Sequence, residues 1–102
     1  MADDILYTIL NELDITYQDD AQEMKISRLI RSGKAYLDDR YGAPIDYCTD
    51  AQALELLISY CRYGRSNAIE QFGHDFACEI TALSLRGAME AGQDGESNET
   101  KI

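Results

Sequence analysis

LIRSGKAYLDDRYG, residues 29–42, is the stretch that decides the fold. Asp19 or Asp20 suits the N-cap of a helix that passes through it, and Gly42 suits the left-handed position after its end, with Pro44 just beyond. We therefore predict a spine helix over about residues 20–41, roughly 33 Å long and able to cross the whole domain. Its buried stripe follows a spacing of three and four residues: Ile26, Leu29, Ile30, Gly33, Tyr36, Leu37 and Tyr41.

Composition limits the kinds of protein that this chain can be. It has 102 residues, 45% of them hydrophobic, which predicts one globular domain. Its formal net charge of −10 argues against nucleic-acid binding, which needs clusters of Lys and Arg. We expect no membrane span, no signal peptide behind the acidic Asp3-Asp4 start, and a cytoplasm-like compartment in which the three cysteines stay reduced.

The remaining sequence predicts further helices around the spine. Asp3 or Asp4 can cap a first helix that ends near Asp14. Residues 43–48 form a loop that could include a short strand, and Thr49 with Gln52 reads as a capping box that opens the next helix. The apolar face of that helix comprises Leu54, Leu57, Ile58 and Cys61, and Gly64 is expected to end it.

Two more segments complete the prediction. A short helical segment covers residues 67–72, and a last helix carries the stripe Phe76, Ile80, Leu83 and Gly87. From Gly92 the sequence becomes too polar to bury anything, so we predict a helical domain over 1–91 and a flexible acidic tail over 92–102. The fold class is thus all-α, a small bundle of about four helices.

Three blocks of this sequence resemble one known family, the head-tail connector (adaptor) proteins of tailed phages, also described as putative DNA-packaging proteins. The spine resembles that family's long helix in its Leu29-Ile30 pair, small Gly33, aromatic Tyr36 and closing Gly42. The segment from Ala53 to Tyr63 is similar to its apolar helix ending in tyrosines, and the segment from Phe76 to Gly87 to its closing helix with a terminal Leu-Arg-Gly. The acidic tail departs from the pattern.

The resemblance implies a structural virion protein without catalysis or cofactor. Members assemble into a homo-oligomeric ring, a dodecamer by resemblance, that lies below the portal at the head-tail junction, extends the DNA channel and docks a tail-completion (stopper) protein. DNA passes through such a ring without specific binding. The resemblance also implies that the C-terminal region engages the portal, with Arg86, Lys101 and Ile102 as candidates, so deletion after Ala91 is expected to spare the fold and weaken portal binding.

Within the helices, small and aromatic residues are the candidates for helix packing or oligomer contacts. A glycine inside a helix costs about 1 kcal/mol relative to alanine, so Gly33 suggests that another helix approaches closely there. The full set of candidates is Ile30, Gly33, Tyr36, Leu37, Tyr41, Tyr60 and Tyr63.

Few residues of this chain suit a catalytic or a metal site. His74 and Cys78 could share a helical face with Cys61 nearby, but a fourth zinc ligand is missing and buried thiols are the simpler interpretation. The pair Asp38-Asp39 reads as a solvated face rather than as an acid-base pair. No phosphate-binding or nucleophile motif is present, so we predict no enzyme.

One rival function stays open at this point. The excess of acid and the seven tyrosines also suit a small acidic helical interaction module, of the inhibitor or DNA-mimic type, that occupies a basic protein partner. Its acids are spread over several helices instead of forming one strip.

Overall fold

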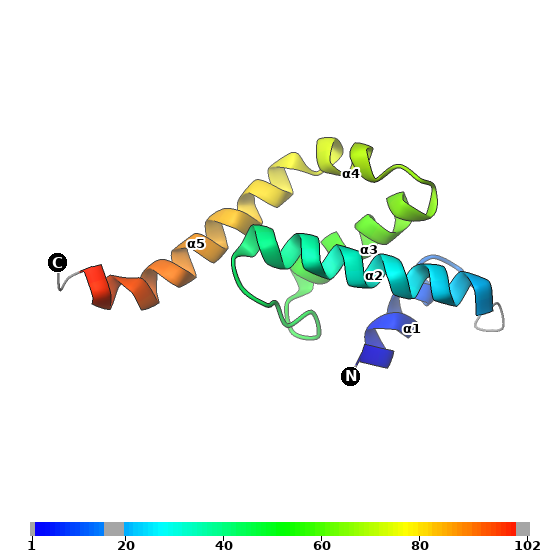
Figure 1. Ribbon diagram of the computed structural model, residues 1–102, viewed down its shortest axis with the longest axis horizontal. Helices are drawn as coiled ribbons and strands as arrows, with labels where there is room; N and C mark the ends of the chain where they lie inside the picture. The colour runs from blue at the N-terminus through cyan, green and yellow to red at the C-terminus, as the bar shows by residue number, and fades with distance from the viewer. Residues whose placement is uncertain (1, 16–19, 100–102) are drawn as a thin grey trace.

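The protein is all-helical in the computed structural model, which describes residues 2–15 and 20–99. The described chain contains no strand, so the loop after the spine forms turns instead of the possible strand. Figure 1 shows the order of the elements, which are α1 (Ala2–Glu12), α2 (Asp20–Tyr41), α3 (Ala51–Arg65), α4 (Ile69–Asp75) and α5 (Ala77–Glu99).

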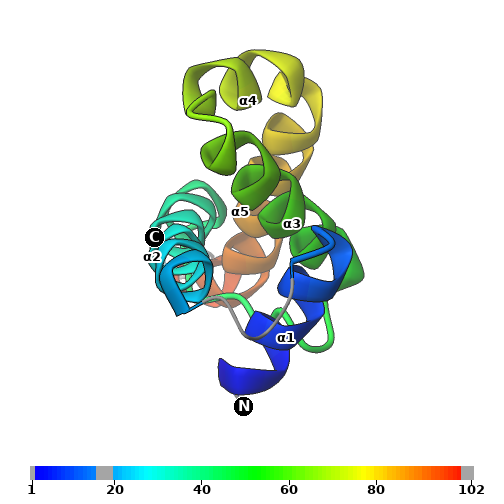
Figure 2. The ribbon, with the colours of Figure 1, turned by 90° about the vertical axis from the view of Figure 1, so that its right-hand side faces the viewer.

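Helix α2 occupies the predicted residues and organises the fold. It packs against α1, α3 and α5, and it lies along one side of the molecule with these three helices beside it (Figures 1 and 2). Its buried residues are Ile26, Ile30, Gly33 and Leu37, spaced as the sequence predicts. Gly42 ends the helix with a φ of +96°, and its N–H donates to the carbonyl of Asp38 at 2.8 Å. The α2 stripe therefore forms one wall of the core.

The other helices complete the core with their own apolar stripes. Helix α1 contributes the buried Ile5, Ile9 and Leu10 to its contacts with α2 and α3, and Leu13, directly after the helix, is buried too. The largest side chains that are almost fully enclosed come from all five helices: Phe72, Ile9, Leu10, Ile26, Leu37, Leu57 and Leu83.

Glycines mark the places where helices approach most closely. A Cβ on Gly33 would lie 2.7 Å from Leu57 Cδ1 and 2.9 Å from Tyr60 Cδ1, so the close partner is α3 of the same chain. A Cβ on Gly87 would collide with the backbone of Tyr41, 2.8 Å from its carbonyl carbon. Because backbone atoms cannot move aside as a side chain can, the α5 crossing over the end of α2 requires glycine.

Two predicted helix ends are wrong, each by a few residues. Gly64 lies inside α3, where a Cβ would be 2.5 Å from Leu29 Cδ2, and the chain turns instead at Asn67 with a φ of +58°. Asn tolerates this left-handed conformation, so the turn does not need Gly64. Gly64 instead allows α3 to pack closely against Leu29. Consequently α4 begins at Ile69 and ends at Asp75, later than the predicted 67–72.

The predicted capping box at α3 is also wrong. The N-cap is Asp50, whose carboxylate accepts from the backbone N–H of Ala53 at 3.1 Å. Thr49 belongs to the preceding turn, where its hydroxyl donates to the carbonyl of Asp46 at 3.4 Å. A carboxylate at the N-cap can also accept from a cation on another helix, which Asp50 does.

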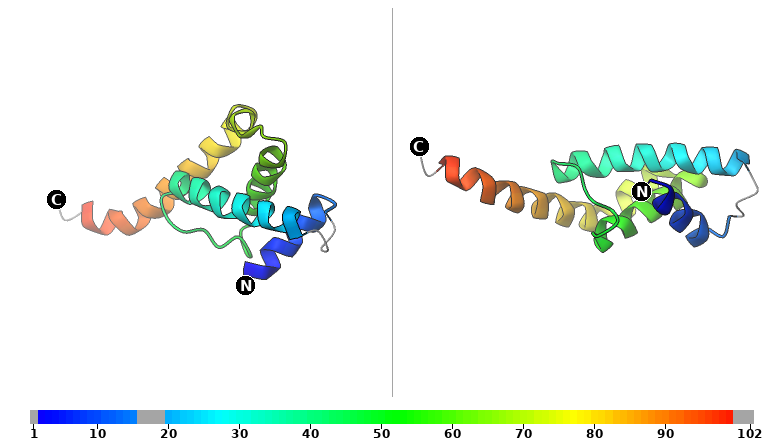
Figure 3. Two further views of the ribbon diagram at one scale, coloured as in Figure 1. Left: turned by 45° about the vertical axis from the view of Figure 1, so that its right-hand side comes forward. Right: turned by 90° about the horizontal axis from the view of Figure 1, so that it is seen from below.

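Helix α5 continues to Glu99, whereas the sequence predicted that helix ends near Ala91. Its C-terminal turns project away from the other helices (Figure 3). The projection makes the molecule elongated, with extents of 56 × 30 × 18 Å and a radius of gyration of 15.5 Å, against about 13 Å for a compact domain of 100 residues. The predictions for Asp19, Lys101 and Ile102 lie outside the described residues.

The Gly87 crossing is testable with a matched pair of variants. We expect Gly87→Ala to lower the free energy of unfolding by about 1 to 3 kcal/mol, because its Cβ overlaps the Tyr41 backbone. Gly73→Ala is the control, since the nearest atom to its Cβ would be Tyr36 Oη at 3.9 Å, and helix propensity predicts a gain of up to about 1 kcal/mol. Urea denaturation measures both, and equal effects would contradict the close crossing.

Candidate interaction surfaces

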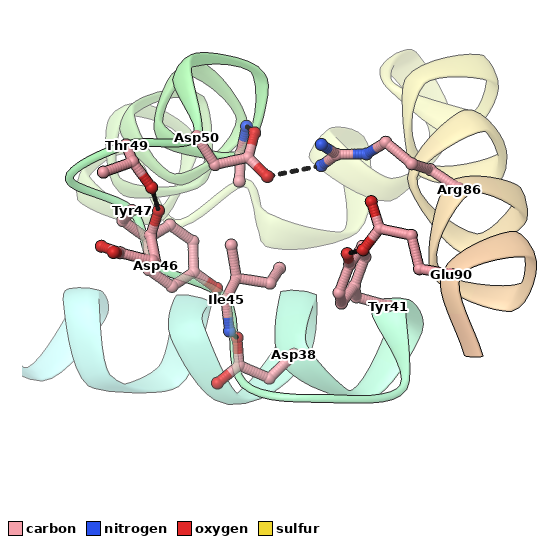
Figure 4. A network of polar contacts seen from close by, with 10 residues as sticks. Asp38, Tyr41, Ile45, Asp46, Tyr47, Thr49, Asp50, Arg86 and Glu90 are labelled. Carbon is pink, nitrogen blue, oxygen red and sulfur yellow. Dashed lines mark hydrogen bonds and ion pairs between the residues drawn. The ribbon is translucent and has the colours of Figure 1, made fainter. Parts of the chain in front are cut away.

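A polar network joins the end of α2, the start of α3 and the middle of α5 (Figure 4). Arg86 on α5 donates from Nη2 to Asp50 Oδ2 at 2.7 Å, and Asp50 caps α3. Burial alone would raise the pKa of the Asp50 carboxyl, but the Ala53 N–H and the Arg86 guanidinium outweigh it and hold this pKa below its ordinary value. The ion pair therefore ties α5 to the start of α3.

Tyr41, the last residue of α2, connects this network to the spine. Its ring lies under the Arg86 guanidinium, 5.4 Å from centroid to Cζ, and its hydroxyl donates to the Glu90 carboxylate. The Nε of Arg86 is buried without a hydrogen-bond partner. Arg86, which the family resemblance suggested as a portal-binding residue, thus has intramolecular partners on both α2 and α3.

Asp38 anchors the loop between α2 and α3. Its carboxylate accepts from the Tyr47 hydroxyl at 2.7 Å and from the Ile45 N–H at 3.2 Å. Burial, reinforced by the bond to Asp38, raises the pKa of the Tyr47 phenol. The solvated-face interpretation of this pair is therefore wrong for Asp38 and right for Asp39, whose side chain is 77% exposed.

An aromatic cluster fills the space between α2, α3 and α4. Phe72 lies at its centre, 5.4 Å from the Tyr60 ring, 5.9 Å from Tyr63 and 5.0 Å from Phe76. Tyr36 joins from α2, with its ring 5.9 Å from that of Tyr60. At the rim, the Tyr63 hydroxyl donates to Asp75 at 2.9 Å.

The residues predicted to pack between helices or between subunits therefore make their contacts within their own chain. The structure buries four of them and leaves three half-buried against the core; in chain order the set is Ile30, Gly33, Tyr36, Leu37, Tyr41, Tyr60 and Tyr63. Because these side chains contact helices of their own chain, they offer little surface to a second molecule.

The cysteines and the histidine do not converge on one site. Cys61 is buried, and burial raises the pKa of its thiol to about 12, while Cys48 and Cys78 are exposed. The His74 side chain is 84% exposed, with Nδ1 3.5 Å from Asp75. Within residues 2–15 and 20–99, no group of three His, Cys, Asp or Glu side chains is placed to hold a metal ion. None of the helices described there is both long and apolar enough to cross a membrane.

Sequence reasoning missed the surfaces that remain open to a partner. Met24 on α2 is 66% exposed, and Leu85 and Met89 on α5 are 60% and 68% exposed. A second signal on α5 could have revealed them, because Cys78, Ala82, Leu85 and Met89 recur with a spacing of four, three and four residues off the buried stripe. Near Met24, an open hollow of about 300 Å³ is lined by Glu23, Met24, Ser27, Arg28 and Arg31.

No family model, curated protein or solved structure matches this chain.

The polar network predicts a pH-dependent contribution of Asp50 to stability. Asn at this position keeps the N-cap but loses the charge, so we expect Asp50→Asn to lower the free energy of unfolding at pH 7 by about 1 kcal/mol. A carboxyl whose pKa is depressed in the folded state stabilises it above the unfolded pKa and stops doing so as pH falls through the folded value. The gap between wild type and variant should therefore close below about pH 4.

Urea denaturation over a pH series measures this gap. Asp39→Asn is the control, because an exposed carboxylate of this kind changes stability by no more than about 0.5 kcal/mol. A gap that is absent at pH 7, or that stays constant down to pH 3, would show that the pair with Arg86 does not stabilise the fold.

Proposed function

We propose that this chain is a structural virion protein, a head-tail connector that assembles as a ring below the portal, extends the DNA channel and docks the next tail-completion protein. The proposal begins from the resemblance of the blocks around Gly33, Tyr60 and Gly87 to that family. It involves no catalysis, and it locates the protein at the head-tail junction of a virion made in the host cytoplasm.

The observation that carries the proposal is the projecting end of α5. A protomer that folds for itself gains nothing from a helix that leaves its own core and exposes Leu85 and Met89. A neighbouring subunit that covers this helix buries its exposed apolar side chains. The elongated shape, 56 Å by 30 Å by 18 Å, also suits subunits placed side by side in a ring.

Charge supports the same proposal. A net charge of −10 makes the surface repel a DNA phosphate backbone at short range. A channel wall needs this property, because attraction would hold the packaged DNA instead of letting it slide. On this proposal the acidic surface is needed so that DNA can slide through the channel, and it does not indicate a basic ligand.

The second candidate, a small acidic module that binds a basic protein, is favoured by the same net charge. A DNA mimic is expected to concentrate its acids on one face, whereas α2 presents Lys25, Arg28 and Arg31 along its N-terminal half. These bases make the connector the better proposal.

Co-purification with the portal protein encoded beside this chain tests the function. We expect the two proteins to form a stable complex, and electron microscopy of the complex or of the concentrated protein to show rings. Light scattering that finds a stable monomer or dimer, together with failure to bind the portal, would favour the acidic module instead.

The C-terminal residues give a more local test. We expect deletion of residues 100–102, which removes Lys101 and Ile102, to leave thermal stability and ring formation unchanged and to weaken portal binding, because the family resemblance assigns the portal contact to the C-terminal region. Lys101→Glu separates charge from length. If the truncated ring binds the portal with full affinity, these residues have no part in docking.

A further inference from the structure

Two surfaces at opposite ends of the molecule complement each other. The first, here called the α5 face, comprises Leu85, Met89 and the acidic end of the helix that follows them. The second, the α2 face, comprises Met24, Arg28 and Arg31, with Glu23 at its edge. We propose that the α5 face of one copy packs on the α2 face of a second copy, an inference that rests on the proposed ring and names its subunit contact.

The α5 face is a second apolar side of a helix whose first side is already used. Leu83 and Gly87 are buried against the core, whereas Leu85 and Met89 follow each of them by two residues, a rotation of about 200° around the helix axis. Leu85 and Met89 therefore point away from the core, 60% and 68% exposed. A helix that is apolar on two sides is expected to be covered on both.

The α2 face offers an apolar contact beside two arginines. Met24 is 66% exposed at the edge of the hollow, and a flexible methionine adapts to an incoming side chain. Among the described residues, no carboxylate forms an ion pair or hydrogen bond with Arg28 or Arg31. On a chain with 19 acidic and 9 basic residues, unpaired arginines on one face call for an external partner.

The sequence of α5 supplies the opposite charge. Beyond Glu90, whose carboxylate accepts from Tyr41 of its own chain, the helix contains Asp94, Glu96 and Glu99 and no basic residue. Acidic residues at one end and free arginines at the other make the chain complementary to itself. A second copy is therefore the occupant that the charges favour, because it brings both an acidic helix and an apolar pair to the same place.

The positions of the two faces exclude contact within one chain. Helix α2 begins at one end of the long axis and α5 finishes at the other, as the two views agree (Figures 1 and 3). A copy that uses its α5 face on a neighbour keeps its own α2 face free for the next copy. Such a head-to-tail contact produces a ring when the rotation between copies closes, and a filament when it does not.

Charge reversal at both faces tests the contact. One variant combines Arg28→Glu with Arg31→Glu, and the other combines Asp94→Lys with Glu96→Lys. We expect each variant alone to associate at least about tenfold more weakly than wild type, as like charges then meet, and an equal mixture of the two, or all four changes in one chain, to recover association. Sedimentation velocity over a concentration series measures it, with circular dichroism to verify folding.

Two further variants make the result specific. Leu85→Gln with Met89→Gln removes the apolar part without changing charge and should also weaken association. Arg62→Glu with Glu55→Lys reverses charges on the exposed face of α3 and should leave association unchanged.

The possible failures are distinguishable. If wild type forms rings and both reversal variants assemble equally well, or if the mixture does not recover, the subunit contact lies elsewhere while the connector function stands. If wild type stays monomeric both alone and with the portal, the function and the contact are both overturned.

Discussion

The close crossing of α5 over the end of α2 is the constraint on which the rest of the structure depends. Gly87 brings the two backbones together at Tyr41, where a single Cβ would not fit. The flanking residues then hold the crossing in place, Arg86 through Asp50 and Glu90 through the Tyr41 hydroxyl. Because the crossing lies at the end of α2 and near the middle of α5, the second half of α5 has no helix left to pack on and must project.

The polar contacts around this crossing fix the relative positions of helices and loops that the apolar core alone would define less well. Asp38 fixes the loop by accepting from Tyr47 and Ile45, and Asp50 begins α3 at the end of that loop. The same Asp50 then accepts from Arg86. Each contact is modest in free energy, but together they determine where α3 starts relative to both α2 and α5.

The sequence predicted well what depends on local pattern and poorly what depends on a distant partner. The stripe through Ile26, Ile30 and Leu37 and the stop at Gly42 follow from helical spacing and backbone conformation, and both are confirmed. The sequence predicted Thr49 as the cap of α3, whereas Asp50 takes this position, where its carboxylate also binds Arg86, 36 residues away. Likewise Gly64 resembled a stop signal because nothing local showed that Leu29 would lie against it. The exposure of Leu85 and Met89 was not predicted because the stripe through Ile80, Leu83 and Gly87 already accounts for the helical pattern of this segment.

Net charge is a poor guide to this molecule unless its distribution is considered. The total of −10 conceals Arg28 and Arg31, which lie close together on α2 beside Glu23, and their position changes which assemblies are favourable. In the proposed ring, Arg28 and Arg31 lie in the seams between subunits, opposite the acidic end of a neighbouring α5. Burying the arginines removes positive charge from the accessible surface, so the wall of the assembled channel is left more uniformly acidic than the surface of a single copy. Self-association and repulsion of DNA then follow from one arrangement of charge, since the same seam that attracts the next subunit withdraws the groups to which a phosphate backbone would bind.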